Sequence, residues 1–121
     1  MVSQEFKDAF FWKLGNELVN GMTRRVAVDT GDLKNSIDFH VIGNKIFFTM
    51  KKHWKYVEFG TAPHEIRVRN KKALSDGKTI FGKKVNHPGT SPQPFIRPTF
   101  HQDLSRAINS AIEFAKREAQ I

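Results

Sequence analysis

The residues best suited to acid–base or metal chemistry are five scattered histidines: His40, His53, His64, His87 and His101. Glu65 follows His64, but the second histidine that a helical zinc motif requires at fixed spacing is missing. His87 precedes Pro88-Gly89, which is typical of an exposed turn. The chain has no cysteine, so disulfides, thiolate catalysis and cysteine-ligated zinc are excluded.

Phosphate and magnesium chemistry also lack a recognisable motif. No glycine-rich segment matches the P-loop or the dinucleotide fingerprint. The acidic residues are few and mostly stand beside basic ones, which argues against a carboxylate-rich magnesium site. We therefore expect no enzymatic activity, no cofactor, no metal and no small-molecule substrate. A small nuclease using histidine and lysine stays open as an alternative, because its residues need only meet in space.

Positive charge is the stronger chemical signal. Lysine and arginine number 20 against 12 acids, a formal net charge of +8. Residues 61–96 hold seven basic residues and two acids, Glu65 and Asp76. The basic residues are candidate contacts for DNA or for an acidic protein surface: Arg67, Arg69, Lys71, Lys72, Lys78, Lys83 and Lys84. A non-specific nucleic-acid-binding protein is therefore an alternative function, because no motif for sequence-specific readout is present.

Length and composition indicate a single domain over residues 1–121. The apolar content of 39%, with 11 phenylalanines, supplies a core. The apolar patch Ala9–Trp12 is too short for a signal peptide and is flanked by charges. No apolar run approaches the roughly 20 residues that a membrane-spanning helix needs, so we expect no membrane contact.

Two long helices are predicted at the ends of the chain. In residues 3–27, with Ser3 as the N-cap, apolar residues recur four apart: Phe6, Phe10, Leu14, Leu18, Met22 and Val26. Gly15 and Gly21 are tolerable there if something packs close to them. Pro98 is expected to be the first residue of the final helix, whose stripe is rich in alanine: Leu104, Ala107, Ile108, Ala111, Ile112, Ala115 and Ala119.

The segment between them predicts an antiparallel sheet. Ile37–Val41 and Lys45–Met50 alternate around the two-residue turn Gly43-Asn44. Phe47 points away from the other apolar residues of its strand and needs a cover. Further short strands are expected at 66–69 and around Gly82. The fold class is therefore α+β, with a sheet of about three to five strands packed against both helices.

A short helix and an extended arm complete the prediction. His53–Phe59 is expected to be helical and to end at Gly60. Residues 62–93 are expected to form a basic extended loop or arm, whose length and charge fit a segment that reaches a neighbouring subunit.

Three segments in order carry a family resemblance: Val28-Asp29-Thr30-Gly31-Asp32-Leu33-Lys34-Asn35-Ser36-Ile37, Tyr56-Val57-Glu58-Phe59-Gly60-Thr61 and His87-Pro88-Gly89-Thr90-Ser91-Pro92-Gln93-Pro94-Phe95-Ile96-Arg97-Pro98. At this spacing, between a long first helix and a final helix, they resemble the neck or tail-component (tail-completion) proteins of long-tailed bacteriophages. Thr99 stands where relatives often carry alanine.

The resemblance implies a structural virion protein at the head–tail junction, made in the host cytoplasm. It implies a ring, with a hexamer as the expected form, that contacts head-closure and tail proteins and performs no catalysis. Non-specific contact with DNA is a further expectation.

The motif residues also make sense as parts of the fold: Thr30, Gly31, Leu33, Ser36, Glu58, Phe59, Gly60, Thr61, Pro94, Phe95 and Pro98. Thr30-Gly31-Asp32 is expected to turn the chain out of the first helix. Glu58 is expected to pair with a basic residue such as Arg97 or with a loop backbone, and Phe95 to enter the core.

Overall fold

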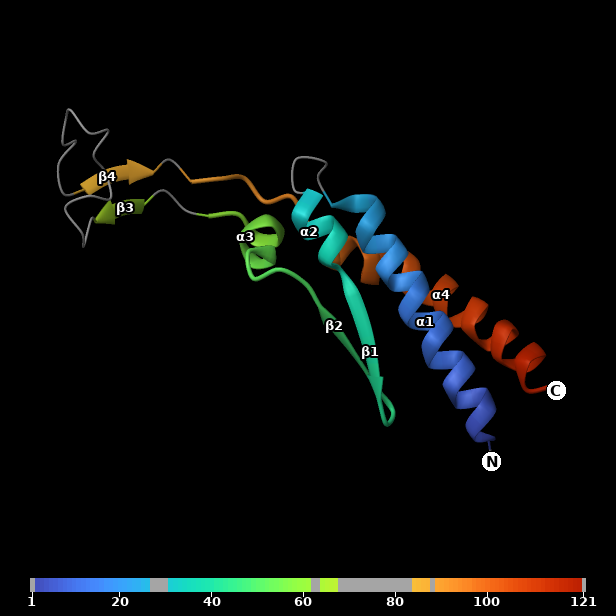
Figure 1. Ribbon diagram of the computed structural model, residues 1–121. Coiled ribbons are helices and arrows are strands. Elements are labelled where there is room, and N and C mark those ends of the chain that lie inside the picture. Colours follow the sequence, from blue (N-terminus) through green and yellow to red (C-terminus); the bar gives the residue numbers. More distant parts are fainter. Residues whose placement is uncertain (1, 27–30, 62–63, 68–83, 88, 121) are drawn as a thin grey trace.

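The computed structural model describes residues 2–26, 31–61 and 89–120, and the backbone of residues 64–67 and 84–87. In chain order the elements are α1 (Gln4–Arg25), α2 (Gly31–Ser36), β1 (Asp38–Ile42), β2 (Lys45–Thr49), α3 (Trp54–Phe59), β3 (His64–Arg67), β4 (Lys84–His87) and α4 (Ile96–Glu118). Figure 1 shows α1 and α4 side by side and antiparallel, with the β1–β2 hairpin next to α1. The predicted α+β class, with an antiparallel sheet and a long helix at each end of the chain, is confirmed.

Helix α1 begins where the sequence predicts. The Oγ of Ser3 accepts a hydrogen bond from the Phe6 N–H at 3.1 Å, so Ser3 caps the helix. Leu14, Leu18 and Met22 of the predicted apolar stripe are buried. The stripe therefore gives α1 its inward face.

Small side chains let α4 lie close to α1. Ala107, Ala111 and Ala115 recur every four residues on α4, and all three are buried. Ala107 and Ala111 share an apolar cluster with Leu14 and Leu18 of α1. The alanine stripe predicted from the sequence thus meets another helix.

The predicted hairpin is confirmed. Val41 pairs with Ile46 and Ile42 pairs with Lys45, which leaves Gly43-Asn44 as the two-residue turn. Gly43 has a φ of 62°, in the left-handed region that glycine adopts without steric cost.

One face of this hairpin packs on the helices. The Phe39 ring lies so close to Gly15 that a Cβ on Gly15 would collide with the ring. A side chain therefore does pack closely against this glycine. Ile46 and Phe48 contact the apolar core, whereas Phe47 on the other face is 46% exposed.

A second cluster closes the other end of the helix pair. Its buried members come from α1, α2, their flanking residues and the segment before α4: Met22, Val26, Leu33, Ile37 and Phe95. Trp54 and Val57 of α3 pack against it. Phe95 is fully buried, so the predicted insertion of this side chain into the core is confirmed.

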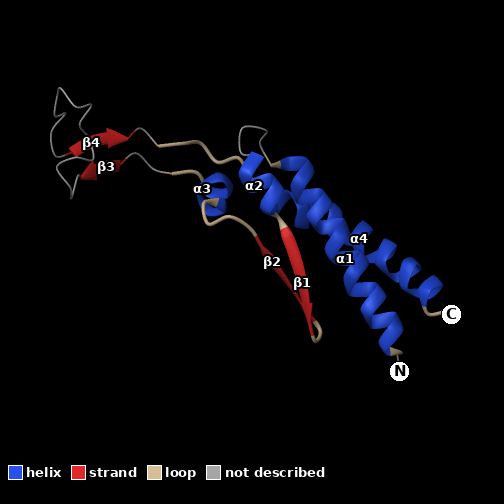
Figure 2. Ribbon diagram, viewed as in Figure 1, coloured by secondary structure: helices blue, strands red, loops and turns tan. Residues whose placement is uncertain are grey.

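The strands are arranged differently from the prediction. Among the described residues they form two separate two-stranded sheets, and the expected single sheet of three to five strands is wrong for them (Figure 2). β3 lies two residues earlier than expected and pairs antiparallel with β4, from His64 opposite His87 to Arg67 opposite Lys84. Residues 79–83, which hold most of the hairpin expected around Gly82, lie outside the described residues.

The path of the chain explains this difference. The bridge between Thr61 and Thr90 holds together the segment that leaves α3 and the segment that enters α4. β3 and β4 continue this pair away from the helices, so they do not reach an edge of the β1–β2 sheet (Figure 1). In the described part of the chain, no helix has the length and apolar character needed to cross a membrane.

Candidate functional site

The carboxylate of Glu58 joins two of the sequence motifs. It is 1% exposed and lies at the start of α4. Its Oε1 accepts hydrogen bonds from the backbone N–H groups of Phe95 (2.8 Å) and Ile96 (2.7 Å). Its Oε2 accepts from the backbone N–H of Arg97 at 3.1 Å and from Arg97 Nε at 2.8 Å. Both partners expected for Glu58, a basic side chain and a loop backbone, are therefore present.

Glu58 also explains where α4 starts. The N-cap and first three residues of a helix have N–H groups with no partner inside the helix. Glu58 accepts three of them, and the fourth position is Pro98, which has no N–H group. The prediction that Pro98 is the first helical residue is wrong by two positions, because the Glu58 carboxylate extends the helix back to Ile96.

Burial and hydrogen bonding act on Glu58 in opposite directions. Burial by itself would raise the pKa of Glu58, but the donors at Ile96, Arg97 and Phe95 together outweigh it and lower the pKa. The carboxylate is therefore charged at neutral pH. Arg97 also donates to the Glu58 carbonyl oxygen at 2.9 Å, so its guanidinium contacts both the carboxylate and the backbone of Glu58.

The backbone around Gly60 adds close contacts between the end of α3 and the segment before α4. Gly60 has a φ of 70°, and a Cβ there would lie 2.5 Å from the Thr90 carbonyl oxygen. Thr61 and Thr90 exchange two backbone hydrogen bonds at 3.0 Å, and their hydroxyls lie 3.1 Å apart. The Gln93 N–H donates to the Val57 carbonyl at 2.8 Å. The second and third motifs thus form one hydrogen-bonded unit.

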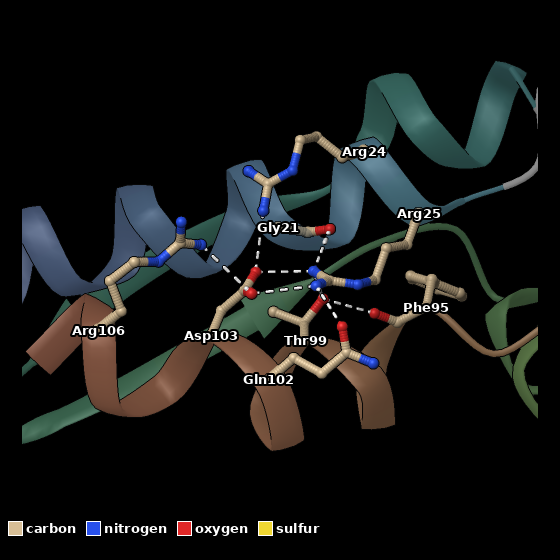
Figure 3. Close-up of polar contacts among 8 residues, drawn as sticks. All are labelled: Gly21, Arg24, Arg25, Phe95, Thr99, Gln102, Asp103 and Arg106. Carbon is tan, nitrogen blue, oxygen red and sulfur yellow. Dashed lines mark hydrogen bonds and ion pairs between the residues drawn. The ribbon is translucent and has the colours of Figure 1, made fainter.

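A second buried carboxylate, Asp103, lies between α1 and α4 (Figure 3). Arg25 donates to both of its oxygens, at 2.7 and 3.0 Å, and Arg24 donates at 3.0 Å. Arg106 lies 3.3 Å from Oδ1, one turn further along α4. Arg25 also donates to the Thr99 hydroxyl and the Gln102 amide oxygen at 3.2 Å.

The charges in this cluster stabilise one another. The hydrogen bonds from Arg25 lower the pKa of Asp103 and outweigh the opposing effect of burial, with the charges of Arg25, Arg106 and Arg24 adding to them. The same hydrogen bonds to Asp103 raise the pKa of Arg25. Gly21 makes room for the cluster, since a Cβ there would lie 2.6 Å from Asp103 Oδ2.

The sequence analysis missed the Asp103 cluster. Its signal is in the pattern of α4, where Thr99 and Asp103 precede Ala107 in the same four-residue stripe. A carboxylate on the apolar face of a helix requires partners, because burying an unpaired charge is costly. Arg24 and Arg25 at the end of α1 are those partners, but only the pairing of α1 with α4 identifies them.

Apolar side chains are exposed at both ends of the helix pair. On α3, Tyr56 is 62% exposed and Phe59 is 56% exposed, with the Arg97 guanidinium 4.8 Å from the Phe59 ring centre. At the other end, an apolar pocket lies beside the start of α1 and is lined by Val2, Phe6, Lys7, Phe10, Phe11, Asn44 and Ile112. The exposed aromatic side chains of α3 were not identified from the sequence.

The first motif and the basic residues are only partly described. Gly31 begins α2, Leu33 is fully buried, and the Ser36 hydroxyl donates to the Leu33 carbonyl and accepts from the Lys51 N–H. Thr30 lies outside the described residues. Arg67 ends β3 opposite Lys84 in β4. The other five basic candidates lie outside the described residues: Arg69, Lys71, Lys72, Lys78 and Lys83.

The remaining motif residue, Pro94, lies on the surface. Pro94 is exposed and lines a shallow surface hollow with Arg97, Pro98 and His101. In the part of the chain that the structure describes, no three histidine or acidic side chains are placed to hold a metal ion.

Comparison with known protein families gives a match for about the first half of the chain. Residues 2–60 match the model of the HK97-gp10-like family, described as "Bacteriophage HK97-gp10, putative tail-component". This part of the chain is similar to a phage tail-component family. The resemblance to a phage neck and tail protein family is thereby confirmed. No curated protein and no solved structure matches the chain.

The match supports a structural role in a phage tail and a place in the virion. It covers α1 to α3 and ends at Gly60, so it includes the Glu58 carboxylate but not the α4 donors that Glu58 binds. A tail component interacts with other structural proteins of the phage, and surfaces for such contacts are therefore the relevant feature of this molecule.

Proposed function

We propose that this chain is a non-enzymatic subunit of the head–tail junction, a neck or tail-completion protein that acts by oligomeric assembly. The observation that carries the proposal is the match of residues 2–60 to a tail-component family. In this proposal the chain is a single domain over residues 1–121. It forms a ring, with a hexamer as the expected form, that contacts head-closure and tail proteins.

The described structure supports an assembly role in two ways. Large apolar side chains are exposed on several elements, including Trp12 of α1, Ile42 of β1 and Tyr56 of α3. Exposed apolar side chains of this size are available for contacts with other proteins. The β3–β4 pair also extends away from the helices, where a neighbouring subunit can reach it (Figure 1).

Within this proposal the motif residues maintain the fold and the basic arm makes contacts. Glu58, Gly60, Thr61 and Phe95 hold α3 against the start of α4. The seven basic residues of the 62–93 arm meet an acidic protein surface or DNA that passes through the ring. Removing residues 70–86 is then expected to leave a folded protein that assembles poorly.

The test is the solution mass of the purified chain, measured by light scattering at low and high salt. A discrete ring-sized multiple of 13.9 kDa is expected. A monomer at every concentration and salt would contradict autonomous oligomeric assembly. Deleting 70–86 without any loss of assembly would contradict the role of the arm.

A second candidate, non-specific nucleic-acid binding, is favoured by the net charge of +8 and by the seven basic residues of residues 61–96. It predicts a monomer or dimer that binds DNA of any sequence, with an affinity that falls steeply as salt rises. Changing Lys71, Lys72, Lys83 and Lys84 to glutamine would then reduce the salt slope. A ring that does not bind DNA at low salt excludes this candidate.

A further inference from the structure

The register of the β3–β4 pair places two histidines opposite each other. His64 is the first residue of β3, and its antiparallel partner is His87, the last residue of β4. We propose that these two histidines form a binding site for a zinc ion, which links the two strands where the pair begins. The inference goes beyond the proposed function, because it applies to a single copy of the chain as well as to a ring.

The bridge between Thr61 and Thr90 shows which kind of pair the histidines form. Thr61 and Thr90 exchange two backbone hydrogen bonds of 3.0 Å. His64 lies three positions after Thr61, and His87 lies three positions before Thr90, so the register is the same in both places. Hydrogen-bonded and non-hydrogen-bonded positions alternate along an antiparallel pair. The histidines therefore occupy a non-hydrogen-bonded position, where opposite Cα atoms are only about 4.5 Å apart.

Two histidines at such a position suit a transition-metal ion. Residues directly opposite each other lie on the same face of the pair, with Cβ atoms about 4.5–5.5 Å apart. Imidazole nitrogen binds zinc at about 2.0–2.1 Å, so two histidines at this separation can share one ion, and water can complete its tetrahedral coordination. Magnesium and calcium prefer oxygen ligands and are not expected to bind there.

The other three histidines are arranged differently. His40 lies in β1 opposite Phe47. His53 precedes α3, and His101 lies in α4. Among the strands that the structure describes, two histidines are therefore opposite each other only in the β3–β4 pair. No motif of fixed spacing contains this pair, because its two residues come from separate strands.

Prolines beside both histidines give a bound ion a structural role. Pro63 precedes His64, and Pro88 follows His87. Proline has no N–H group, so neither proline can donate a hydrogen bond to a strand partner. A zinc ion held by both histidines links the strands next to these residues, at the start of the pair that extends away from the helices (Figure 1).

The test is calorimetric titration of the purified, tag-free full chain with zinc chloride at about pH 7.5, where histidine is neutral. One zinc ion per chain is expected to bind. His64→Ala and His87→Ala each remove a ligand, so each is expected to weaken binding by about tenfold or more. His40→Ala is the matched control, because it removes a strand histidine that is paired with Phe47, and it should bind zinc like the wild type. Magnesium chloride should give no binding.

A further variant tests the register independently of the metal. The chain has no cysteine, so the double variant His64→Cys with His87→Cys contains only the two introduced thiols. A disulfide needs Cα atoms about 4.4–6.8 Å apart, which a non-hydrogen-bonded pair provides. Mild oxidation is therefore expected to join the two residues within one chain, as mass spectrometry without reduction would show. The oxidised variant should no longer bind zinc.

Three outcomes would overturn the inference. If the disulfide forms but the wild type binds no zinc even at millimolar concentration, the two histidines are opposite each other without forming a metal site. If both alanine variants bind zinc as tightly as the wild type, other groups hold the ion. If neither zinc binding nor the disulfide is found, the register is wrong as well. These results leave the proposed oligomeric assembly untouched, because light scattering tests it separately.

Discussion

The two buried carboxylates, Glu58 and Asp103, accept hydrogen bonds from different kinds of donor. Glu58 is satisfied mainly by backbone N–H groups at the start of α4, with one arginine added. The Asp103 carboxylate pairs with three arginine side chains from α1 and α4. Backbone donors are fixed by the path of the chain, whereas arginine side chains can substitute for one another.

This difference predicts different sensitivities to mutation. Loss of Glu58 leaves the N–H groups of Phe95, Ile96 and Arg97 without the acceptor that Glu58 provides. Loss of any one arginine around Asp103 leaves two others. Mutation of Glu58 is therefore expected to destabilise the fold strongly. Around Asp103, mutation of one arginine is expected to be tolerated, whereas mutation of the carboxylate itself is not.

The largest effect is expected from Glu58→Ala. It removes the acceptor of three helix N–H groups and the partner of the half-exposed Arg97 together, which should lower the free energy of unfolding by about 3–5 kcal/mol. Urea unfolding followed by circular dichroism measures this. Glu58→Gln keeps the shape and one acceptor oxygen, so it should lose less. A Glu58→Ala protein within about 0.5 kcal/mol of the wild type, the range of ordinary surface changes, would show that the junction does not hold α4 in place.

A smaller loss is expected from Asp103→Asn. The amide keeps one acceptor for Arg25 but loses the charge, while Arg25 stays mostly buried, so we expect about 2 kcal/mol. Urea unfolding again provides the value. Ser105→Ala, at an exposed position two residues further along α4, is the control and should be near neutral. If Asp103→Asn is as stable as this control, the cluster contributes nothing to the pairing of α1 with α4.

Acid should weaken both sites by less than truncation does, because a protonated carboxyl still packs and accepts hydrogen bonds. Both groups have a lowered pKa when folded, so their stabilisation is present above their unfolded pKa values of about 4 and is lost as pH falls through the lower folded values. Unfolding measured from pH 7 to pH 2 should show this loss below about pH 4. The double variant Glu58→Gln with Asp103→Asn should show a flatter curve, and an unchanged curve would contradict the assignment.

The smallest effect is expected from Arg24→Ala. Its side chain is 54% exposed, and Arg25 and Arg106 remain to pair with Asp103, so the loss should be at most about 0.5 kcal/mol. Arg25→Ala is the contrast, because it removes the donor that contacts both carboxylate oxygens and should cost more. Equal losses in the two variants, measured in parallel urea titrations, would show that the arginines are not redundant.

Local patterns predicted the elements of this chain well. The four-residue repeat after Ser3 identified α1, and the alternation around Gly43-Asn44 identified the β1–β2 hairpin. These signals are local, because a helix face and a two-residue turn are written in adjacent residues. The start of α4 was misplaced because its cap, Glu58, is 38 residues away from Ile96.

The candidate site was predicted less completely than the elements. The motifs around Glu58 and Phe95 were recognised, and so was a pairing of Glu58 with Arg97. The Asp103 cluster and the exposed aromatic side chains of α3 were not predicted. Arg25 and Asp103 are 78 positions apart in the sequence, and no periodicity relates residues on different helices.

The sequence by itself determined the α+β class, the long terminal helices, the hairpin and the resemblance to a phage tail-component family. Only the tertiary structure decided which polar groups meet and which apolar ones stay outside. Glu58, the acid of α3, is buried because α4 starts against it, while Tyr56 and Phe59 of the same short helix are exposed because its packing face is already filled by Trp54 and Val57. The direction in which α3 presents its residues is set by contacts between distant segments, and a linear pattern does not contain those contacts.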